Sequence, residues 1–240
     1  MPFCHFVYVQ SDDPQFELAP EKIEAARAIV QGLPNLRRGL FFLPARARDY
    51  YTDDGPSPRL ALQLYYDTLE ALEHTISAQG PLRKLADPAL LGDVPGLRVT
   101  HQAMYARPYD VLDDVHRPDG TEKPCSYLVH YPGTAEDFNA WLDYYLDHHP
   151  QIMKTFPRIR EIEIYTRVGW RDRMRWERVD YMQRNRLIFD SAAALEAALN
   201  SGVRHDMRAD FEKFPPFTGS NIHFPMLTEE LVGNPERWRS

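Results

Sequence analysis

The chain of 240 residues is 43% hydrophobic and 26% charged, which is enough to bury a core in one large domain or two small ones. Its formal net charge of −7 argues against nucleic acid and anionic membranes as partners, because both are polyanionic. No apolar run approaches the roughly 20 residues of a membrane-spanning helix, so we expect no membrane partner.

The two cysteines, Cys4 and Cys125, each open a predicted strand. Two thiols are too few for a disulfide framework, and a free cysteine commonly serves as a small apolar side chain. The first ten residues have the composition of a strand and lack the basic and apolar regions of a signal peptide. We therefore expect reduced thiols and a cytoplasmic location.

The sequence is typical of an internal duplication. Landmarks recur at one offset of 123 residues, the difference between the positions of Pro157 and Pro34. The same offset joins Tyr8 to Tyr131, Arg37 to Arg160, Arg48-Asp49 to Arg171-Asp172, Asp67 to Asp190, Glu73 to Glu196, Asp87 to Asp210 and Gly96 to Gly219. We therefore predict two copies of one unit, residues 1–109 and 125–240, joined by a polar linker at 110–124.

Both copies predict the same order of elements, strand-helix-strand-strand-helix-strand. In chain order the first copy has a strand at 4–10, a helix at 17–33, strands at 35–43 and 59–67, a helix at 68–86 and a strand at 97–106. The second has a strand at 125–131, a helix at 134–153, strands at 158–168 and 183–190, a helix at 191–214 and a strand at 220–226. The strands are rich in β-branched and aromatic residues, and Thr68 and Ser191 stand where helix N-caps belong.

This order is the ferredoxin-like βαββαβ unit, which has both helices on one face of a four-stranded sheet. The other face is apolar and has to pack against a second sheet. We therefore predict an α+β fold in which the two repeats pack sheet to sheet within one chain. We expect a hollow between them that one histidine overlooks.

That histidine lies on the helix at 134–153, for which Thr134 to Asp137 resembles a capping box. At about 100° per residue, His149 falls on the apolar face in line with Tyr145, while His148 lies at its edge. The matching positions of the first copy are both alanine. A buried histidine satisfied by one hydrogen bond is one interpretation. Proton transfer is the other, because imidazole titrates near neutral pH.

The second copy resembles the EthD-type proteins of the dimeric α+β barrel superfamily. The resemblance rests on an aromatic residue four positions before a histidine and on a Pro-x-hydrophobic-Arg segment that leads into the next strand. Its residues are Phe138, Tyr145, His149, Pro150, Pro157 and Arg160; the first copy keeps only Leu33 to Arg37. The resemblance implies a barrel formed by two sheets and a pocket between sheet and helix. Relatives in the superfamily include cofactor-free decarboxylases, lactone isomerases, ring monooxygenases and haem enzymes, so the fold alone selects no reaction.

Side chains of the strand at 125–131 alternate, so His130 and Tyr131 point to opposite faces. Which of the two faces the pocket stays open, and ordinary packing is the alternative for each. His130 is a candidate acid–base partner of His149, and Tyr131 is a candidate catalytic residue. Tyr145, Trp141 and His148 of the helix are candidate substrate contacts, as is Tyr8 of the first strand.

Three polar residues, Arg184, Asn185 and Arg186, interrupt the strand at 183–190. By alternation the two arginines share one face and Asn185 takes the other. A guanidinium inside the barrel would pair with a carboxylate, for which a substrate is a candidate; an exposed strand face is the alternative.

Nucleotide-binding loops, zinc motifs and nucleophile-elbow motifs are absent from the sequence. We expect no metal and no cofactor, with haem ligation by His149 as a remaining alternative. The reaction that we favour is decarboxylation of an aromatic or conjugated carboxylic acid, whose conjugation delocalises the developing charge. A lactone isomerase, a cofactor-free monooxygenase and a non-catalytic binding barrel are the alternatives. We expect a monomeric barrel or a homodimer.

Overall fold

The computed structural model describes residues 2–91, 96–117 and 122–234. Its first half contains β1 (Phe3–Ser11), α1 (Pro20–Gln31), β2 (Arg38–Pro44), β3 (Leu60–Tyr66), α2 (Leu69–Thr75), the 3₁₀ helix η1 (Pro81–Ala86) and β4 (Leu97–Tyr109). Its second half contains β5 (Cys125–Tyr131), α3 (Phe138–Met153), β6 (Ile159–Arg167), β7 (Glu177–Arg178), β8 (Gln183–Phe189), α4 (Ala192–Leu199), α5 (Gly202–Phe211) and β9 (Ile222–Val232). No helix among these residues is long and apolar enough to cross a membrane.

Eight strands close into an antiparallel barrel, so the predicted α+β barrel within one chain is confirmed. The strands follow the order β1-β3-β2-β9-β5-β8-β6-β4, and β4 returns to β1. The halves are joined edge to edge by β2 with β9 and by β4 with β6. Closure leaves no open sheet edge at these joins, which explains why β9 continues to Val232, beyond the predicted end of the strand. β7 adds two residues beside β4.

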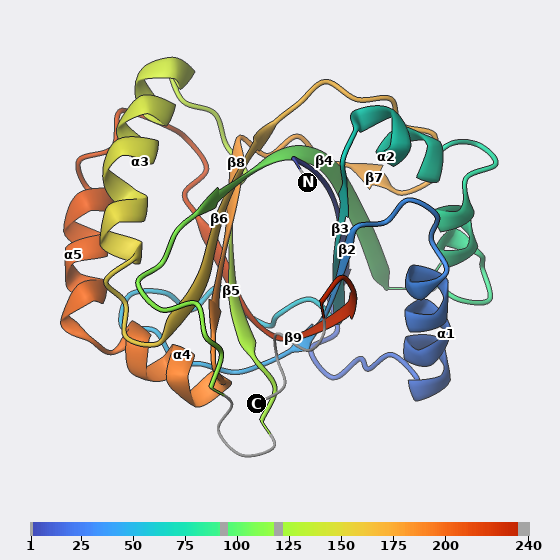
Figure 1. The fold of residues 1–240 in the computed structure, drawn as a ribbon, viewed down its shortest axis with the longest axis horizontal. Helices are drawn as coiled ribbons and strands as arrows, with labels where there is room; N and C mark the ends of the chain where they lie inside the picture. Colours follow the sequence, from blue (N-terminus) through green and yellow to red (C-terminus); the bar gives the residue numbers. More distant parts are fainter. Residues whose placement is uncertain (1, 92–95, 118–121, 235–240) are drawn as a thin grey trace.

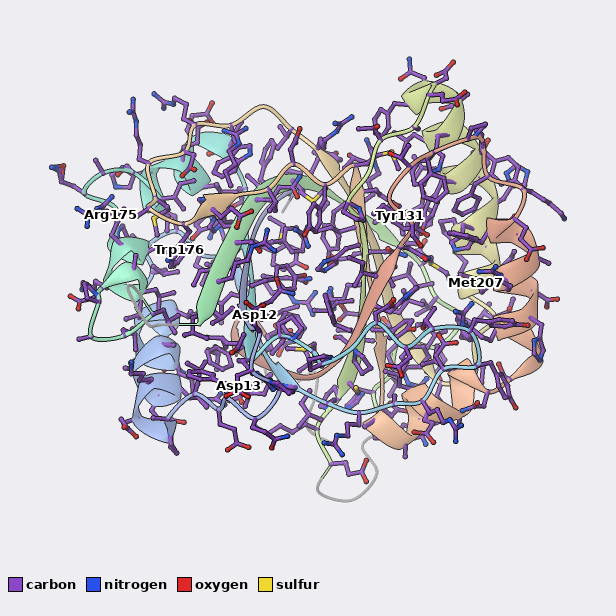
Figure 2. All side chains as sticks on the ribbon, turned by 180° about the vertical axis from the view of Figure 1, so that it is seen from behind. Asp12, Asp13, Tyr131, Arg175, Trp176 and Met207 are labelled. Carbon is purple, nitrogen blue, oxygen red and sulfur yellow. The ribbon has the colours of Figure 1, made fainter. Side chains whose placement is uncertain are left out.

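The helices form two layers outside the barrel (Figure 1). α3, α4 and α5 cover the sheet of the second half, whereas α1 and α2 lie on the opposite side of the barrel. Figure 2, which views the molecule from the opposite side, shows Tyr131 and Met207 on the side of the barrel where α5 lies and Trp176 on the side where α1 lies. Each of the long helices predicted at 68–86 and 191–214 is divided in two.

The backbone repeats the duplication that the sequence indicates. Asn35 and Arg158, which are 123 positions apart, both adopt a positive φ, at 58° and 59°. Gly96 and Gly219 have the same offset and φ values of 76° and 80°. A left-handed conformation is costly for a residue with a Cβ, so its recurrence at matching positions supports two copies of one unit.

Ion pairs repeat in the same way. Arg37 pairs with Asp67, and the matching Arg160 pairs with Asp190. The first pair is exposed and the second is buried.

The segments between the second and third strands of each half cross to the other half. The backbone N–H of Arg48 donates to Glu196 at 3.1 Å, and that of Arg171 donates to Glu73 at 2.8 Å. These two contacts are related by the offset of 123 residues. The crossing segment of each half therefore packs against the helix layer of the other half.

Two local predictions are wrong. Tyr8 lies opposite Ala61 in its strand pair and His130 lies opposite Arg184, so the structural counterpart of Tyr8 is His130 and not Tyr131. The histidine helix begins at Phe138 with Asp137 as its N-cap, because the Asp137 carboxylate accepts from the N–H of Ala140. Thr68 and Ser191 are N-caps as predicted.

Side chains pack the barrel interior, and His149 is not among them. The apolar part of this interior includes Phe6, Phe42, Tyr65, Leu128 and Tyr165, all at most 1% exposed. His149 instead lies outside the barrel, between the sheet and the helices of the second half. The expectation that His149 overlooks the shared interior is therefore wrong, because the closed barrel packs its own side chains inward and His149 lies on the other face of the sheet.

Candidate functional site

α3 holds His149 in its last turns and buries it against the sheet. His149 is 4% exposed, whereas His148 is exposed and stacks on Tyr144 at 4.2 Å. The prediction that only one of the two histidines points inward is confirmed. Pro150 follows it inside the helix and has no N–H to donate to the carbonyl of Leu146.

Asp210 of α5 binds the imidazole of His149. Its Oδ2 lies 2.6 Å from Nδ1, and both side chains are buried. The carboxylate accepts the N–H of Nδ1, so Nε2 of the neutral ring carries the lone pair. Among the described residues, no hydrogen-bond partner is found for Nε2. The imidazole is therefore oriented as a base whose free nitrogen is available to a second molecule.

Burial lowers the pKa of His149, and the hydrogen bond and charge of Asp210 offset this only in part. Burial by itself raises the pKa of Asp210, but the hydrogen bond and charge of His149, together with a hydrogen bond from Tyr144, outweigh it and the pKa is lowered. The pair therefore consists of a carboxylate and a neutral imidazole at neutral pH. This combination suits a general base, whose positive charge after protonation is met by the carboxylate.

A cavity of about 50 Å³ lies beside His149. Its apolar lining includes Met153, Phe156, Leu187, Phe189 and Met207.

Asn185 of β8 places an amide in the same cavity. Its Nδ2 donates to the hydroxyl of Tyr145 at 2.8 Å, and its Oδ1 is buried without a partner in the structure. A buried acceptor without a hydrogen-bond partner costs stability. A common reason for such an acceptor in a native protein is that a ligand supplies the missing partner. Asn185 therefore has the position of a substrate contact.

Tyr131 lines the cavity, whereas Tyr145 and Trp141 form the aromatic packing behind it. Trp141 stacks on Tyr145 at 5.1 Å, and Tyr131 meets Tyr145 edge to face at 5.7 Å. Burial raises the pKa of Tyr131 and of Tyr145. Both hydroxyls therefore stay protonated and can donate a hydrogen bond at neutral pH.

The crossing segment of the first half forms the rim of the cavity. Asp49 accepts from Arg204 of α5 at 2.9 Å and from the hydroxyl of Tyr127 at 2.7 Å. Thr52, Tyr127 and His223 line both this cavity and an outer cleft of about 910 Å³. Three side chains thus separate the buried histidine from a large surface cleft.

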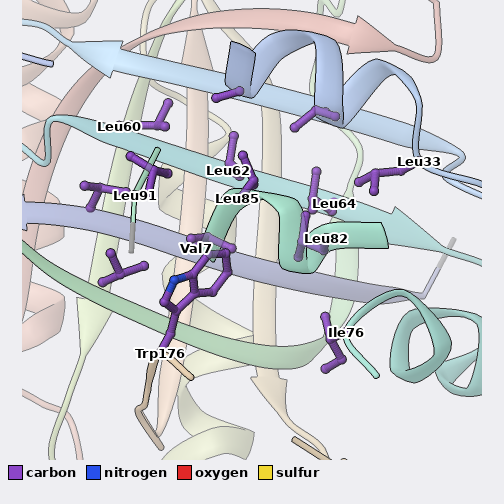
Figure 3. Packing of buried hydrophobic residues seen from close by; sticks show 14 of the residues in the cluster. Val7, Leu33, Leu60, Leu62, Leu64, Ile76, Leu82, Leu85, Leu91 and Trp176 are labelled. Carbon is purple, nitrogen blue, oxygen red and sulfur yellow. The ribbon is translucent and has the colours of Figure 1, made fainter. Parts of the chain in front are cut away.

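The corresponding space of the first half is packed. Ala26 stands at the sequence position that matches His149, and Leu62 stands where the second half has Asn185. The segment that crosses from the second half brings Trp170 and Trp176 into this core. Figure 3 shows Trp176 beside Val7. The two halves therefore differ in the residues that open a cavity in one of them.

Several predicted site residues lie elsewhere. Tyr8, His130, Arg184 and Arg186 point into the barrel, on the opposite face of the sheet from His149. The two arginines share a face, as alternation predicts. None of the four can act together with His149 on a molecule in its cavity. His148 is outside the cavity because it is exposed.

The residues that hold His149 come from distant parts of the sequence. Asp210, Arg204 and Asp49 were not predicted, because no local pattern links them to α3. The sequence shows Asn185 as a polar residue within a strand. It does not show which face of the sheet packs against the helices, and this face decides whether Asn185 reaches the cavity.

Among the described residues, no group of three or more histidine, cysteine and acidic side chains is placed to hold a metal ion. A histidine oriented by a carboxylate resembles an axial haem ligand. A cavity of about 50 Å³ is, however, far too small for the macrocycle, so we derive no step through haem.

No protein-family model matches the sequence, and no curated protein is similar to it. An anthrone oxidase-like protein has a similar structure, with a TM-score of 0.60 and 14% identity over 96% of this chain and 94% of the other. A putative monooxygenase from Fusobacterium nucleatum gives 0.53 and 12% over 95% and 92%. A mutant chlorite dismutase from Candidatus Nitrospira defluvii gives 0.52 and 12% over 93% and 90%. These likenesses show that the chain has the dimeric α+β barrel fold.

Proposed function

We propose that the chain is an enzyme in which His149 transfers a proton on a small aromatic or otherwise conjugated substrate. The observation that carries this proposal is the His149–Asp210 pair, which leaves Nε2 free beside a cavity that also contains an orphaned amide oxygen of Asn185. We retain the EthD-type assignment of the second half and the unit boundaries as parts of the proposal. One chain closes the barrel by itself, so we propose a monomer or a homodimer.

In the first step Nε2 of His149 removes a proton from an activated C–H or O–H group of the substrate. Asp210 stabilises the imidazolium that forms, and the neutral resting state follows from burial. Asn185 or the hydroxyl of Tyr131 binds a substrate oxygen and fixes the distance to Nε2. The apolar lining excludes water, which strengthens both interactions.

The reaction class that we favour is oxygenation without a cofactor. In such a reaction a methylene group between conjugated rings is oxidised by one molecule of oxygen, R₂CH₂ + O₂ → R₂C=O + H₂O, so no external reductant is consumed. Proton removal creates the carbanion that gives electrons to oxygen. The carbanion and oxygen form a peroxide, which takes back the first proton from His149 and becomes the hydroperoxide R₂CH–OOH. Loss of the second C–H proton then forms the C=O bond and breaks the O–O bond, and the hydroxide that leaves takes up this proton as water. The names of two structural neighbours, anthrone oxidase-like protein and putative monooxygenase, support this choice.

Decarboxylation has less support than the sequence indicated. Its substrate carboxylate was assigned to Arg184 or Arg186, and both point into the barrel. Arg204 lines the cavity, but Asp49 already neutralises it. A substrate carboxylate would therefore have to displace Asp49.

The substrate has to enter from the outer cleft. A cavity of about 50 Å³ is smaller than the ~150 Å³ that holds a single benzene ring. Thr52, Tyr127 and His223 separate the cavity from the cleft, so binding requires the crossing segment at 45–59 to move. The affinity for a substrate would then include the cost of breaking the Asp49–Arg204 contact.

The experiment is a screen of hydroxylated polycyclic ketones and phenols with an oxygen electrode, repeated under argon with a carbon dioxide trap. Oxygen consumption with formation of a new carbonyl supports the proposal. Carbon dioxide release under argon replaces oxygenation by decarboxylation, and a spectral change without either gas indicates an isomerase. Retention of a ligand without conversion contradicts an enzymatic function.

With a substrate in hand, His149→Ala should lower turnover by about 10²–10⁴-fold, the usual contribution of a general base. His148→Ala is the matched control, because this neighbour is exposed, and it should leave turnover unchanged. Equal activities of the two folded variants would remove His149 from the mechanism.

A further inference from the structure

Arg184 is a buried cation that lacks a full set of partners. It points from β8 into the barrel and is 1% exposed. Its Nη1 lies 2.9 Å from Nδ1 and 3.0 Å from Nε2 of His130, and its Nε lies 3.4 Å from Oε1 of Gln102. Its Nη2 is buried and has no hydrogen-bond partner in the structure. One nitrogen of a buried guanidinium is therefore free to donate.

The surroundings of Arg184 are aromatic. Its guanidinium lies 4.3 Å from the ring centre of Tyr181, 4.8 Å from that of Tyr8 and 5.3 Å from that of Phe6. Within the described part of the chain, no carboxylate pairs with it. Ring faces attract a cation, but they offset only part of the cost of removing it from water.

Arg186, in the same barrel, is paired with carboxylates, unlike Arg184. It lies two residues further along β8 on the same face, and it binds Glu161 at 3.0 Å and also Glu163. Arg38 forms ion pairs with Glu161 and Glu230. The carboxylates of the interior are thus gathered around Arg38 and Arg186, and Arg184 is left with neutral neighbours.

His130 does not supply the missing negative charge. Burial and the charge of Arg184 hold the pKa of His130 well below its usual value, so the ring is neutral.

A small cavity of about 20 Å³ lies at this position. Arg184, His130, Tyr8, Thr100, Tyr181 and Phe224 contribute to its lining. Gln10 and Ile222, which also line it, are half-buried, so the cavity lies near one end of the barrel. Its volume is that of about one water molecule or one ion of similar size.

We propose that Arg184 and His130 form a binding site for a small monovalent anion, of the size of a halide or formate, inside the end of the barrel. The anion would accept from Nη2 of Arg184 and give this guanidinium the negative partner that its immediate neighbours lack. The site lies on the opposite face of the sheet from the His149 cavity, so it is independent of the proposed reaction.

The test is the anion dependence of stability together with the position of bromide in crystals. Chloride, bromide and formate should each raise the melting temperature in a saturable manner, by about 5–10 °C at one hundred times the dissociation constant. Sodium gluconate at equal ionic strength is the control, because this anion is too large for the cavity. A bromide anomalous peak beside Arg184 is expected.

Arg184→Met should remove the anion dependence, whereas Arg37→Met, which changes an exposed arginine, should retain it. If Arg184→Met does not fold, the bromide map of the unchanged protein decides. Absence of a peak at Arg184, an equal effect of gluconate, or a folded Arg184→Met variant with the full chloride response would each overturn the proposal.

Discussion

Asp190 offers a quantitative test of the fold, because the duplication supplies its own control. The carboxylate is fully buried and accepts from Arg160 at 2.8 and 2.9 Å, from Arg158 at 2.8 Å and from the backbone N–H of Arg117 at 2.7 Å. Asp190→Asn removes the charge that these donors share. Loss of one partner of a buried ion pair costs about 3–5 kcal/mol. Arg160 keeps a contact with Asp113 at 2.9 Å, so we expect the lower end, about 3 kcal/mol.

A loss of about 3 kcal/mol should lower the melting temperature by about 6–12 °C in a chain of this size. Asp67→Asn, the matching change in the first half, should alter stability by less than about 0.5 kcal/mol, because its pair with Arg37 is exposed. Chemical denaturation of the three proteins measures both values. Equal effects of the two substitutions would refute the assignment of a buried and an exposed copy.

The same comparison has a defined pH dependence. Burial alone would raise the pKa of Asp190, but the hydrogen bonds from Arg160, Arg117 and Arg158 outweigh it and hold the pKa at about 2. Because the folded pKa is depressed, the contribution is present above the unfolded value of 3.8 and is lost as the pH falls towards 2. The difference between the unchanged protein and Asp190→Asn should shrink over that interval. A constant difference would contradict the assignment.

Three further changes test the site. Asn185→Leu introduces the residue that the first half has at Leu62. It removes an unpaired buried oxygen, so the free energy of unfolding should rise by about 1 kcal/mol while turnover falls. A loss of stability in urea titration would contradict this. Trp176→Ala should cost about 3–5 kcal/mol in the same assay, since Trp176 fills the core of the first half, and a cost below about 1 kcal/mol would oppose its packing role. In NMR titrations the pKa of His149 should lie below its ordinary value of 6.5, and Asp210→Asn should lower this pKa further. Because the folded pKa is depressed, the unfolded chain takes up the proton first, and the stability of the fold should decrease as the pH falls below 6.5. A His149 pKa above 6.5 would contradict the account.

Local patterns predicted the order of the elements well. The caps at Thr68 and Ser191, the inward His149 and the outward His148 follow from side-chain chemistry and helical periodicity alone. Alternation also predicted that Arg184 and Arg186 share a face.

What failed depends on distant parts of the chain. A one-residue difference between β1 and β5 puts Tyr8 inside the barrel and Tyr131 outside, although both fit the repeat offset of the sequence. Asp210 and Asp49 meet the site only after the helices dock and the crossing segment folds over. The sequence pattern contains no signal for these contacts, because each is formed by tertiary packing.

Small aromatic molecules should bind beside His149 and outside the barrel. Methionine methyl groups report on both places, since Met153 and Met207 line the cavity and Met104 and Met226 lie in the barrel interior. Titration of protein labelled with ¹³C-methyl methionine with phenol should shift the signals of Met153 and Met207 and leave the other two in place. Shifts confined to Met104 and Met226 would contradict the account.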